Sequence, residues 1–383
     1  MKYMVILGDG MADWPDPAHG GRTPLECAHI PNMDRIAREG RCGMLVTVPA
    51  GFEPGSDIAN LSVLGYDPAK YYTGRGALEA ISMGVDLGAG DVAYRCNLVC
   101  IRDGVMEDFS AGHITSGEGA ALLSSLAKEL ADAGIYPGVS YRNLLVVHGG
   151  GGARTVPPHD IVGQETSVSL PSGPDAELLL RCMEVSRRVF ADHPVNLRRI
   201  AEGKTPATSV WPWSGGAKPA LPLFEEKYGL SGGIISAVDL LNGIARCAGM
   251  EVITVPGATG YLDTDYEGKA RAAVAALADV DFVYMHVEAP DEAGHLGSWD
   301  EKVKAIERLD EVIGIILEEA KATIALLPDH PTPIALKTHT SDPVPFAILG
   351  KGTDDVQAYS EKDAKNGSYG LMNALDFLPL LFS

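Results

Sequence analysis

The sequence lacks the features of membrane, exported and nucleic-acid-binding proteins. No apolar run in its 383 residues approaches the roughly 20 residues that cross a bilayer. Its first residues, MKYMVILGDG, enter a strand-like segment directly and have neither the length nor the cleavage site of a signal peptide. A formal charge of −20 argues against nucleic acids and anionic lipid surfaces as partners. We therefore expect a cytoplasmic protein with no nucleic-acid and no membrane partner.

Cysteine is also scarce, and its spacing indicates no disulfide framework. The six cysteines are dispersed, and the close pair Cys96 and Cys100 alternates along a strand-like stretch instead of forming a CxxC motif. We interpret the cysteines as reduced packing residues. The hydrophobic content of 46% is ordinary for a globular protein, and the length exceeds what one core usually organises, so we expect two domains.

Apolar runs alternate with helical patterns at both ends of the chain, which is typical of an α/β fold. The patterns predict strands at residues 2–8, 281–287 and 323–327, and helices at residues 32–39, 266–278 and 299–320. We expect residues 1–71 and 231–383 to form one open α/β sheet domain with helices on both faces.

The middle of the chain has a different character. Strands are predicted at residues 93–101 and 142–148, with a helix near residues 117–134 between them. The stretch at residues 205–222 is rich in Pro, Gly and Trp and is expected to be irregular. We therefore expect residues 72–230 to form a smaller inserted α/β domain.

The inserted region is also much less acidic than the rest of the chain. It contains 14 Lys and Arg and 18 Asp and Glu, a net charge of −4, whereas the remaining residues carry −16. Basic residues flanked by turns include Arg75, Arg95, Arg142 and His113. Arginine recognises phosphate and carboxylate with two hydrogen bonds, so these residues are candidates to bind a small anionic molecule. Taken singly, each of these residues is more readily explained as a surface charge than as a ligand.

Seven residues of metal-binding type are scattered along the chain: Asp9, Ser56, Asp291, His295, Asp329, His330 and His339. Most of them follow an apolar run, such as MVILG before Asp9 or TIALL before Asp329 and His330. The ends of such strands line one crevice in an open α/β sheet. A mixture of carboxylate and imidazole suits two divalent ions such as Mn²⁺ or Zn²⁺. The sequence therefore predicts a two-metal site.

Two of these residue groups carry further information in their spacing. In DEAGH, Asp291 and His295 are four residues apart, which places both on one face of a helical turn. Ser56 follows a Pro-Gly turn and precedes an apolar helical pattern, so it is predicted to lie at a helix N-terminus, where N–H groups stabilise an anion. The simpler alternatives are helix caps for Asp291 and Ser56 and a surface position for His295.

The ordered motifs resemble those of the archaeal-type, cofactor-independent phosphoglycerate mutases of the alkaline phosphatase superfamily. The resemblance covers nearly the whole chain and includes GDGMAD, PGSDIANLSVLGYDP, YTGRGALEA, YRCNLV, FSAGHI, HVEAPDEAGH, PDHPTP and THTSDPVPF. It implies an alkaline phosphatase-like sheet with a substrate-binding inserted domain. It also implies interconversion of 3-phosphoglycerate and 2-phosphoglycerate through a phosphoserine.

Carried over by motif, the resemblance implies a role for each candidate residue. Ser56 is the nucleophile; one metal is held by Asp291, His295 and His339, and the other by Asp9, Ser56, Asp329 and His330. Mn²⁺ is the first expectation, and Zn²⁺, Co²⁺ or Mg²⁺ fit the same ligands. Substrate binding is implied for His113, Arg95, Arg142 and Arg75, and Lys227 in EKYG is expected near Ser56. The oligomeric state is left open.

Some positions depart from the archaeal pattern. Glu288 and Asn242 stand where lysine is common in archaeal members. These departures resemble a bacterial branch sometimes labelled a proposed homoserine kinase. The alternative function is therefore a metal-dependent phosphotransferase on another small substrate, such as homoserine, or a phosphatase.

Overall fold

The structure, a computed structural model, describes residues 1–130 and 132–383, and it divides into two compact units. Unit 1 comprises Met1–Tyr72 and Ala220–Ser383, and unit 2 comprises Thr73–Pro219. The chain returns to unit 1 at Ala220, ahead of the expected position at Ser231. The reason is helix α9 (Phe224–Tyr228), whose Phe224 ring stacks on Phe282 with ring centroids 5.1 Å apart. No helix of the described residues has the length and apolar character needed to span a membrane.

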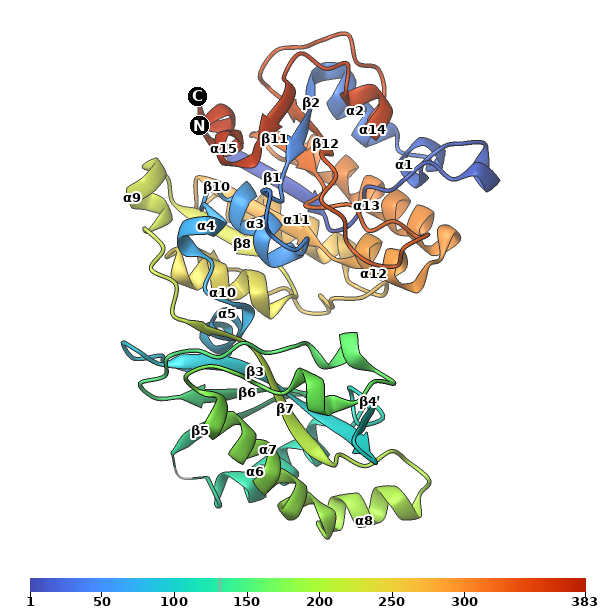
Figure 1. Cartoon of the computed structure of the whole chain (residues 1–383). Helices are drawn as coiled ribbons and strands as arrows, with labels where there is room; N and C mark the ends of the chain where they lie inside the picture. Colours follow the sequence, from blue (N-terminus) through green and yellow to red (C-terminus); the bar gives the residue numbers. More distant parts are fainter. Residues whose placement is uncertain (131) are drawn as a thin grey trace. The chain divides into compact units, whose positions relative to one another are not determined.

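Unit 1 is built on an eight-stranded sheet (Figure 1). Its strands lie in the order β13 (Gly370–Asn373), β2 (Gly40–Val46), β12 (Val344–Leu349), β11 (Thr323–Leu327), β1 (Tyr3–Gly8), β10 (Phe282–Val287), β8 (Gly232–Ile235) and β9 (Glu251–Val252). Strand β1 pairs in parallel with both β10 and β11, whereas β12 is antiparallel to β11 and β2. The carboxyl ends of β1, β10 and β11 therefore meet at one edge of the sheet.

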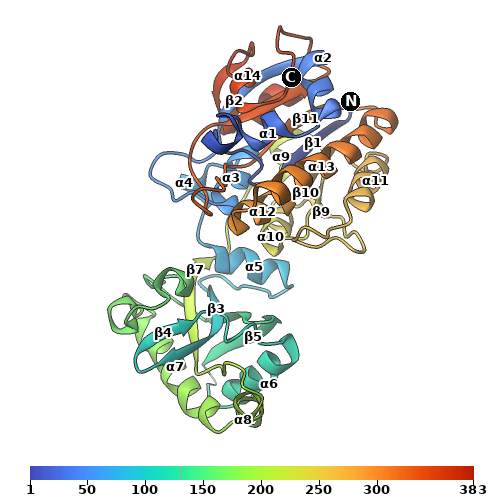
Figure 2. The ribbon, with the colours of Figure 1, turned by 90° about the vertical axis from the view of Figure 1, so that its right-hand side faces the viewer.

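Both faces of this sheet are covered, which explains why β1 and β10 are apolar runs without alternation. Every residue of β10 is buried. Val283 and Met285 join the core that contains residues of helices α2 (Pro31–Glu39), α11 (Tyr266–Ala276) and α13 (Trp299–Glu319). Figure 2 shows α11 and α13 side by side. On the other face, Phe282 meets α9 and Tyr284 bonds to Asn60 of α3 (Ser56–Val63).

The remaining helices of unit 1 connect or flank these elements. They are α1 (Pro24–Cys27), α4 (Pro68–Tyr71), α10 (Asp239–Cys247), α12 (Ala289–Leu296), α14 (Glu361–Ala364) and α15 (Phe377–Phe382). Of these, α12 matters most for the site, because it begins directly after β10.

Unit 2 contains a five-stranded antiparallel sheet. Strands β4 (Val105–Asp108), β3 (Val92–Arg102), β6 (Arg142–Val147) and β5 (Ala133–Val139) lie in that order, and β7 (Ser209–Ala217) also pairs with β3. Residues of α6 (Ser116–Ala127) and α7 (Ala176–Ala191) share the core on one face, while α5 (Arg75–Ser82) packs on the other; α8 (Pro194–Ala201) follows α7.

Two expectations for unit 2 were wrong. The helix predicted near residues 117–134 ends at Ala127, and residues 133–139 form strand β5 instead. The stretch at residues 205–222 was expected to be irregular, but it contains the nine-residue strand β7. A proline is tolerated there because β7 pairs with β3 alone among the described strands, and an edge strand does not need every N–H group.

Candidate functional site

The predicted metal-ligand residues come together at the carboxyl edge of the unit 1 sheet. Asp9 directly follows β1, Asp329 and His330 follow β11, and Asp291 lies in the first turn of α12 after β10. Because β1 pairs in parallel with both neighbours, these three strand ends are adjacent. Ser56 is the first residue of α3, as the sequence predicted.

Asp9, Asp329 and His330 form one group whose ligand atoms all lie within 4.8 Å of one another. The His330 Nε2 atom lies 3.4 Å from Asp9 Oδ1 and 3.5 Å from Asp329 Oδ2. The Ser56 hydroxyl oxygen lies 3.1 Å from the same Nε2 atom. The side chains of Asp9, Asp329 and His330 are all buried. The Ser56 hydroxyl therefore lies beside a compact set of ligands that is shielded from water.

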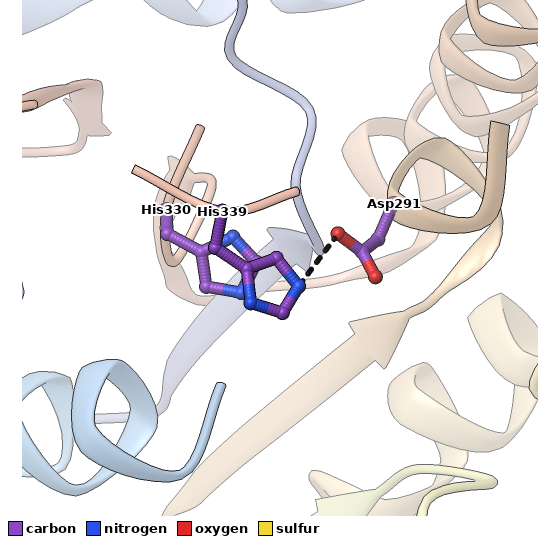
Figure 3. A group of neighbouring side chains, drawn as sticks. All are labelled: Asp291, His330 and His339. Atoms are coloured by element: carbon purple, nitrogen blue, oxygen red, sulfur yellow. Dashed lines mark ion pairs between the residues drawn. The ribbon is translucent and has the colours of Figure 1, made fainter. Parts of the chain in front are cut away.

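Asp291, His330 and His339 form the second group, and Figure 3 shows the two imidazole rings facing the Asp291 carboxylate. His339 Nε2 lies 3.5 Å from Asp291 Oδ1 in the ion pair drawn there. His295 joins this group, since its Nε2 atom is 3.1 Å from Asp291 Oδ2 and 3.0 Å from His339 Nε2. Asp291 and His295 share one face of α12, as their spacing predicted. His330 thus lies between the two groups.

Hydrogen bonds orient the ring nitrogens of two of these histidines. His295 Nδ1 lies 3.0 Å from the carbonyl oxygen of Lys337, to which it donates. His330 Nδ1 lies 3.3 Å from the Thr332 hydroxyl, and that hydroxyl donates to Asp291 Oδ1 at 2.5 Å. With its proton on Nδ1, the neutral His330 ring carries a lone pair on Nε2 that is directed at the ligand groups, whereas His295 Nε2 becomes available once it gives up its proton.

Asn60 fixes the carboxylate of Asp329. Its side-chain amide donates to Asp329 Oδ2 and to the backbone oxygen of Ser56, each at 2.8 Å. Its carbonyl oxygen accepts from the Tyr284 hydroxyl at 2.6 Å. The other Asp329 oxygen accepts from the Gly10 N–H group at 3.1 Å. Strand β10, helix α3 and the loop after β1 therefore all hold one ligand in place.

The electrostatics of the site favour cation binding. Burial, together with Asp329 and Asp291, raises the pKa of Asp9 well above its usual value. Burial lowers the pKa of His330 to about 4, so this imidazole is neutral at pH 7. Although burial lowers it, the hydrogen bond to Asp291 raises the pKa of His295 to about 9. Asp9 Oδ1 is buried and has no hydrogen-bond partner among the described residues, so the donor set fits a divalent cation.

Three arginines predicted to bind substrate lie together in unit 2. Burial lowers the pKa of Arg95, Glu79 opposes this, and the charges of Arg75 and Arg142 lower it further, so both arginines lie close enough to act on Arg95. Arg95 pairs with Glu79 at 3.1 Å and lies over the ring of Trp213 at 4.3 Å. Such a concentration of positive charge is suited to an anionic ligand.

Of the other two predicted substrate-binding residues, His113 lies near the arginines and Lys227 does not lie near Ser56. His113 lies beside Tyr141, with ring centroids 6.2 Å apart, and the guanidinium of Arg142 is 5.8 Å from the same ring. His113 is therefore close to the arginine cluster. Lys227 lies 5.8 Å from the Tyr66 ring, beyond the C-terminal end of α3, so the structure does not bring it to Ser56 at the helix start.

Sequence reasoning missed several residues that support the site, namely Asn60, His286, Thr332 and Lys269. His286 carried a usable signal, because it is the single imidazole in the otherwise apolar strand FVYMHV. Asn60 and Lys269 act through contacts with residues far away in the chain, Asp329 and Glu288, which no local pattern reveals. Thr332 lies two residues from His330, and its contact with that ring depends on the folded loop.

A family model described as 2,3-bisphosphoglycerate-independent phosphoglycerate mutase matches residues 37–196. A protein of that name from Methanothrix thermoacetophila is 54% identical, with all of both chains covered. The chain belongs to this family. A probable mutase of the same name from Geobacter sulfurreducens is 51% identical over 96% of each chain. The family is one of isomerases, as the resemblance implied.

Solved structures agree with this assignment. A Pyrococcus horikoshii protein matches with a TM-score of 0.87 and 32% identity, covering 99% of this chain and 96% of the other. A cofactor-independent phosphoglycerate mutase from Thermoplasma acidophilum matches with a TM-score of 0.68 and 29% identity, covering 100% of this chain and 99% of the other. The α/β fold with two sheets is thus shared along the full length.

Proposed function

We propose that this enzyme interconverts 3-phosphoglycerate and 2-phosphoglycerate by transferring the phosphoryl group through Ser56. The observation that carries the proposal is the position of the Ser56 hydroxyl, at the start of α3 and 3.1 Å from His330, within the buried acidic and imidazole cluster. The names of full-length relatives at more than 50% identity support the substrate class.

In this proposal two divalent ions occupy the ligand groups. Asp9, Ser56, Asp329 and His330 hold one ion, and Asp291, His295 and His339 hold the other. The bound ions supply positive charge that lowers the pKa of the Ser56 hydroxyl and offsets the charge of the phosphoryl oxygens. Mn²⁺ is the first expectation, because carboxylate and imidazole ligands suit it, and Zn²⁺, Co²⁺ and Mg²⁺ share such ligands.

Ser56 performs two successive transfers. In the first, the Ser56 hydroxyl loses its proton as its oxygen forms a bond to phosphorus, the bond from phosphorus to the glycerate oxygen breaks, and that glycerate oxygen takes up a proton in exchange. In the second, the other glycerate hydroxyl loses its proton and attacks phosphorus, the bond to Ser56 breaks, and the Ser56 oxygen takes up a proton, so the overall proton count is unchanged. The backbone N–H groups of the first turn of α3 stabilise the anionic phosphoserine, because they have no partner within the helix.

The arginine cluster of unit 2 is the proposed binding site for the anionic groups of the substrate. Arg75, Arg95 and Arg142 provide forked donors for carboxylate or phosphate oxygens, and His113 adds a further donor beside Tyr141. The ion pair with Glu79 and the contact with Trp213 hold the Arg95 side chain in one orientation.

An enolase-coupled assay tests the proposal. The protein, loaded with Mn²⁺ and supplied with 3-phosphoglycerate without 2,3-bisphosphoglycerate, is expected to turn over, and Ser56→Ala is expected to abolish turnover. Ser62→Ala, on the same helix, is the matched control and should retain activity. Absence of turnover by the intact protein, with ATP-dependent formation of phosphohomoserine instead, would refute the proposal.

A further inference from the structure

A chain of three buried charged or ionisable side chains begins beside Asp9. His286 Nε2 lies 3.1 Å from Asp9 Oδ2, and His286 Nδ1 lies 3.1 Å from Glu288 Oε1. The Lys269 ammonium lies 2.5 Å from Glu288 Oε2. Lys269 and His286 have no exposed surface, and Glu288 has almost none.

Each member of the chain comes from a different element and is held by further contacts. Lys269 is on α11 and also donates to the backbone oxygen of His286 at 3.1 Å. Glu288 precedes α12 and accepts from the Ala237 N–H group at 2.9 Å and from the Ser236 hydroxyl at 3.1 Å. His286 is therefore fixed at both its ring and its backbone.

This arrangement leaves one Asp9 oxygen for the metal group. Oδ2 forms an ion pair with His286 Nε2, which makes no hydrogen bond among the described residues, while Oδ1 likewise has no hydrogen-bond partner there and lies 3.4 Å from His330 Nε2. If His286 turned, the carboxylate could rotate, and the ligand geometry at Asp9, Asp329 and His330 would be lost.

We propose that Lys269, Glu288 and His286 are positioning residues that set the orientation of Asp9 and so the metal affinity of the group formed by Asp9, Asp329 and His330. The inference rests on the proposed function, since it assumes that this group binds a metal ion. A purely stabilising role does not explain the chain, because a buried ion pair usually adds little to stability compared with apolar side chains of the same size.

The test compares metal binding by the Glu288→Gln and Lys269→Met variants with that of the unaltered protein. Metal-free protein is titrated with Mn²⁺ by calorimetry, and the absorption spectrum of the Co²⁺-loaded protein reports the ligand geometry. Loss of a residue that orients a ligand typically weakens metal binding 10-fold to 100-fold, and we expect that range for Glu288→Gln at one of two sites, with a changed Co²⁺ spectrum. The double variant should weaken binding less than the two single effects combined, because both changes break one chain.

Asp310→Asn is the matched control. Asp310 is also a buried carboxylate, and it accepts from the backbone N–H groups of Met33 and Asn32 at 2.7 and 3.0 Å. It lies on α13, and its hydrogen bonds are made to α2, not to a metal-ligand residue. This variant should lower the melting temperature of the metal-free protein and leave Mn²⁺ affinity unchanged.

The outcomes separate this inference from the proposed function. Failure of the unaltered protein to bind two ions would overturn the proposed function. Two ions in the unaltered protein, with Mn²⁺ affinity and Co²⁺ spectrum unchanged in Glu288→Gln and Lys269→Met, would overturn the inference. A lower melting temperature in those variants without a change in metal binding would also overturn it, because the chain would then be structural.

Discussion

Replacing Asn60 by leucine removes the side chain that joins the nucleophile helix to a metal ligand. Leucine is close to asparagine in size, so little cavity forms, but three hydrogen bonds disappear. The Tyr284 hydroxyl, the Ser56 carbonyl and the Asp329 carboxylate each lose a partner in a site where Asn60 itself is fully buried. At about 1 to 3 kcal/mol for each of the three unsatisfied groups, the free energy of unfolding should fall by about 3 to 9 kcal/mol.

Urea unfolding of the metal-free protein measures this loss, and calorimetric titration with Mn²⁺ measures its consequence. Because Asp329 Oδ2 is freed, we expect Mn²⁺ to bind about 10-fold to 100-fold more weakly at one site. The control is Ser62→Ala, which removes one bond from the Ser62 hydroxyl to the Ile58 carbonyl in the same helix and should cost about 1 kcal/mol without altering metal affinity. Unchanged Mn²⁺ affinity in Asn60→Leu would mean that Asn60 does not orient Asp329.

Three further predictions follow from the same contacts. Burial lowers the pKa of His295, but Asp291 outweighs this and raises it to about 9, so Mn²⁺ must displace a proton from the ring. The apparent affinity for Mn²⁺ should therefore rise from pH 6.5 to about pH 9, and an affinity that does not change with pH would contradict this. Lys302→Met should lower the free energy of unfolding by about 3 to 5 kcal/mol because it leaves the buried Asp13 carboxylate unpaired, and Asp13→Asn in the same chain should restore part of it. Arg95→Gln should raise KM for 3-phosphoglycerate about 10-fold or more with a smaller effect on kcat, and an unchanged KM would remove Arg95 from the substrate site.

Stability of the metal-free protein should also depend on pH through His286. Burial lowers its pKa, but Asp9 and Glu288 outweigh that effect and raise it to about 10. The folded state therefore binds the proton more tightly than the unfolded state, so the stabilisation is complete below about pH 6.5 and is lost as pH rises toward 10. In His286→Gln, the melting temperature should change less between about pH 6.5 and pH 10 than it does in the unaltered protein.

The ligand-bearing core of the fold was predictable from sequence for a physical reason. Strands β1, β10 and β11 are covered on both faces, so their apolar runs are unbroken and their ends are marked by the first polar residue, such as Asp9 or Asp329. The helical spacing of Asp291 and His295 likewise depends only on local geometry. The sequence accordingly predicted the residues that the structure brings together.

The parts that sequence missed depend on contacts between distant segments. Strand β2 contains two glycines and an arginine, and it is a strand because it pairs with β12 and β13, about 300 residues away. Strand β7 contains Pro212 and is stabilised by its pairing with β3. Asn60 and Lys269 are ordinary helix residues in sequence, and only the folded chain places them against Asp329 and Glu288.

If Ser56 carries the phosphoryl group, the phosphoserine can be trapped during turnover. The Mn²⁺-loaded enzyme is mixed with 3-phosphoglycerate labelled with ³²P, stopped in acid within one turnover, digested and analysed by mass spectrometry. We expect phosphate on the peptide that contains Ser56, absent from Ser56→Ala and lost when unlabelled 3-phosphoglycerate is added before the stop. Turnover without any label on the protein, or with label on a different residue, would contradict it.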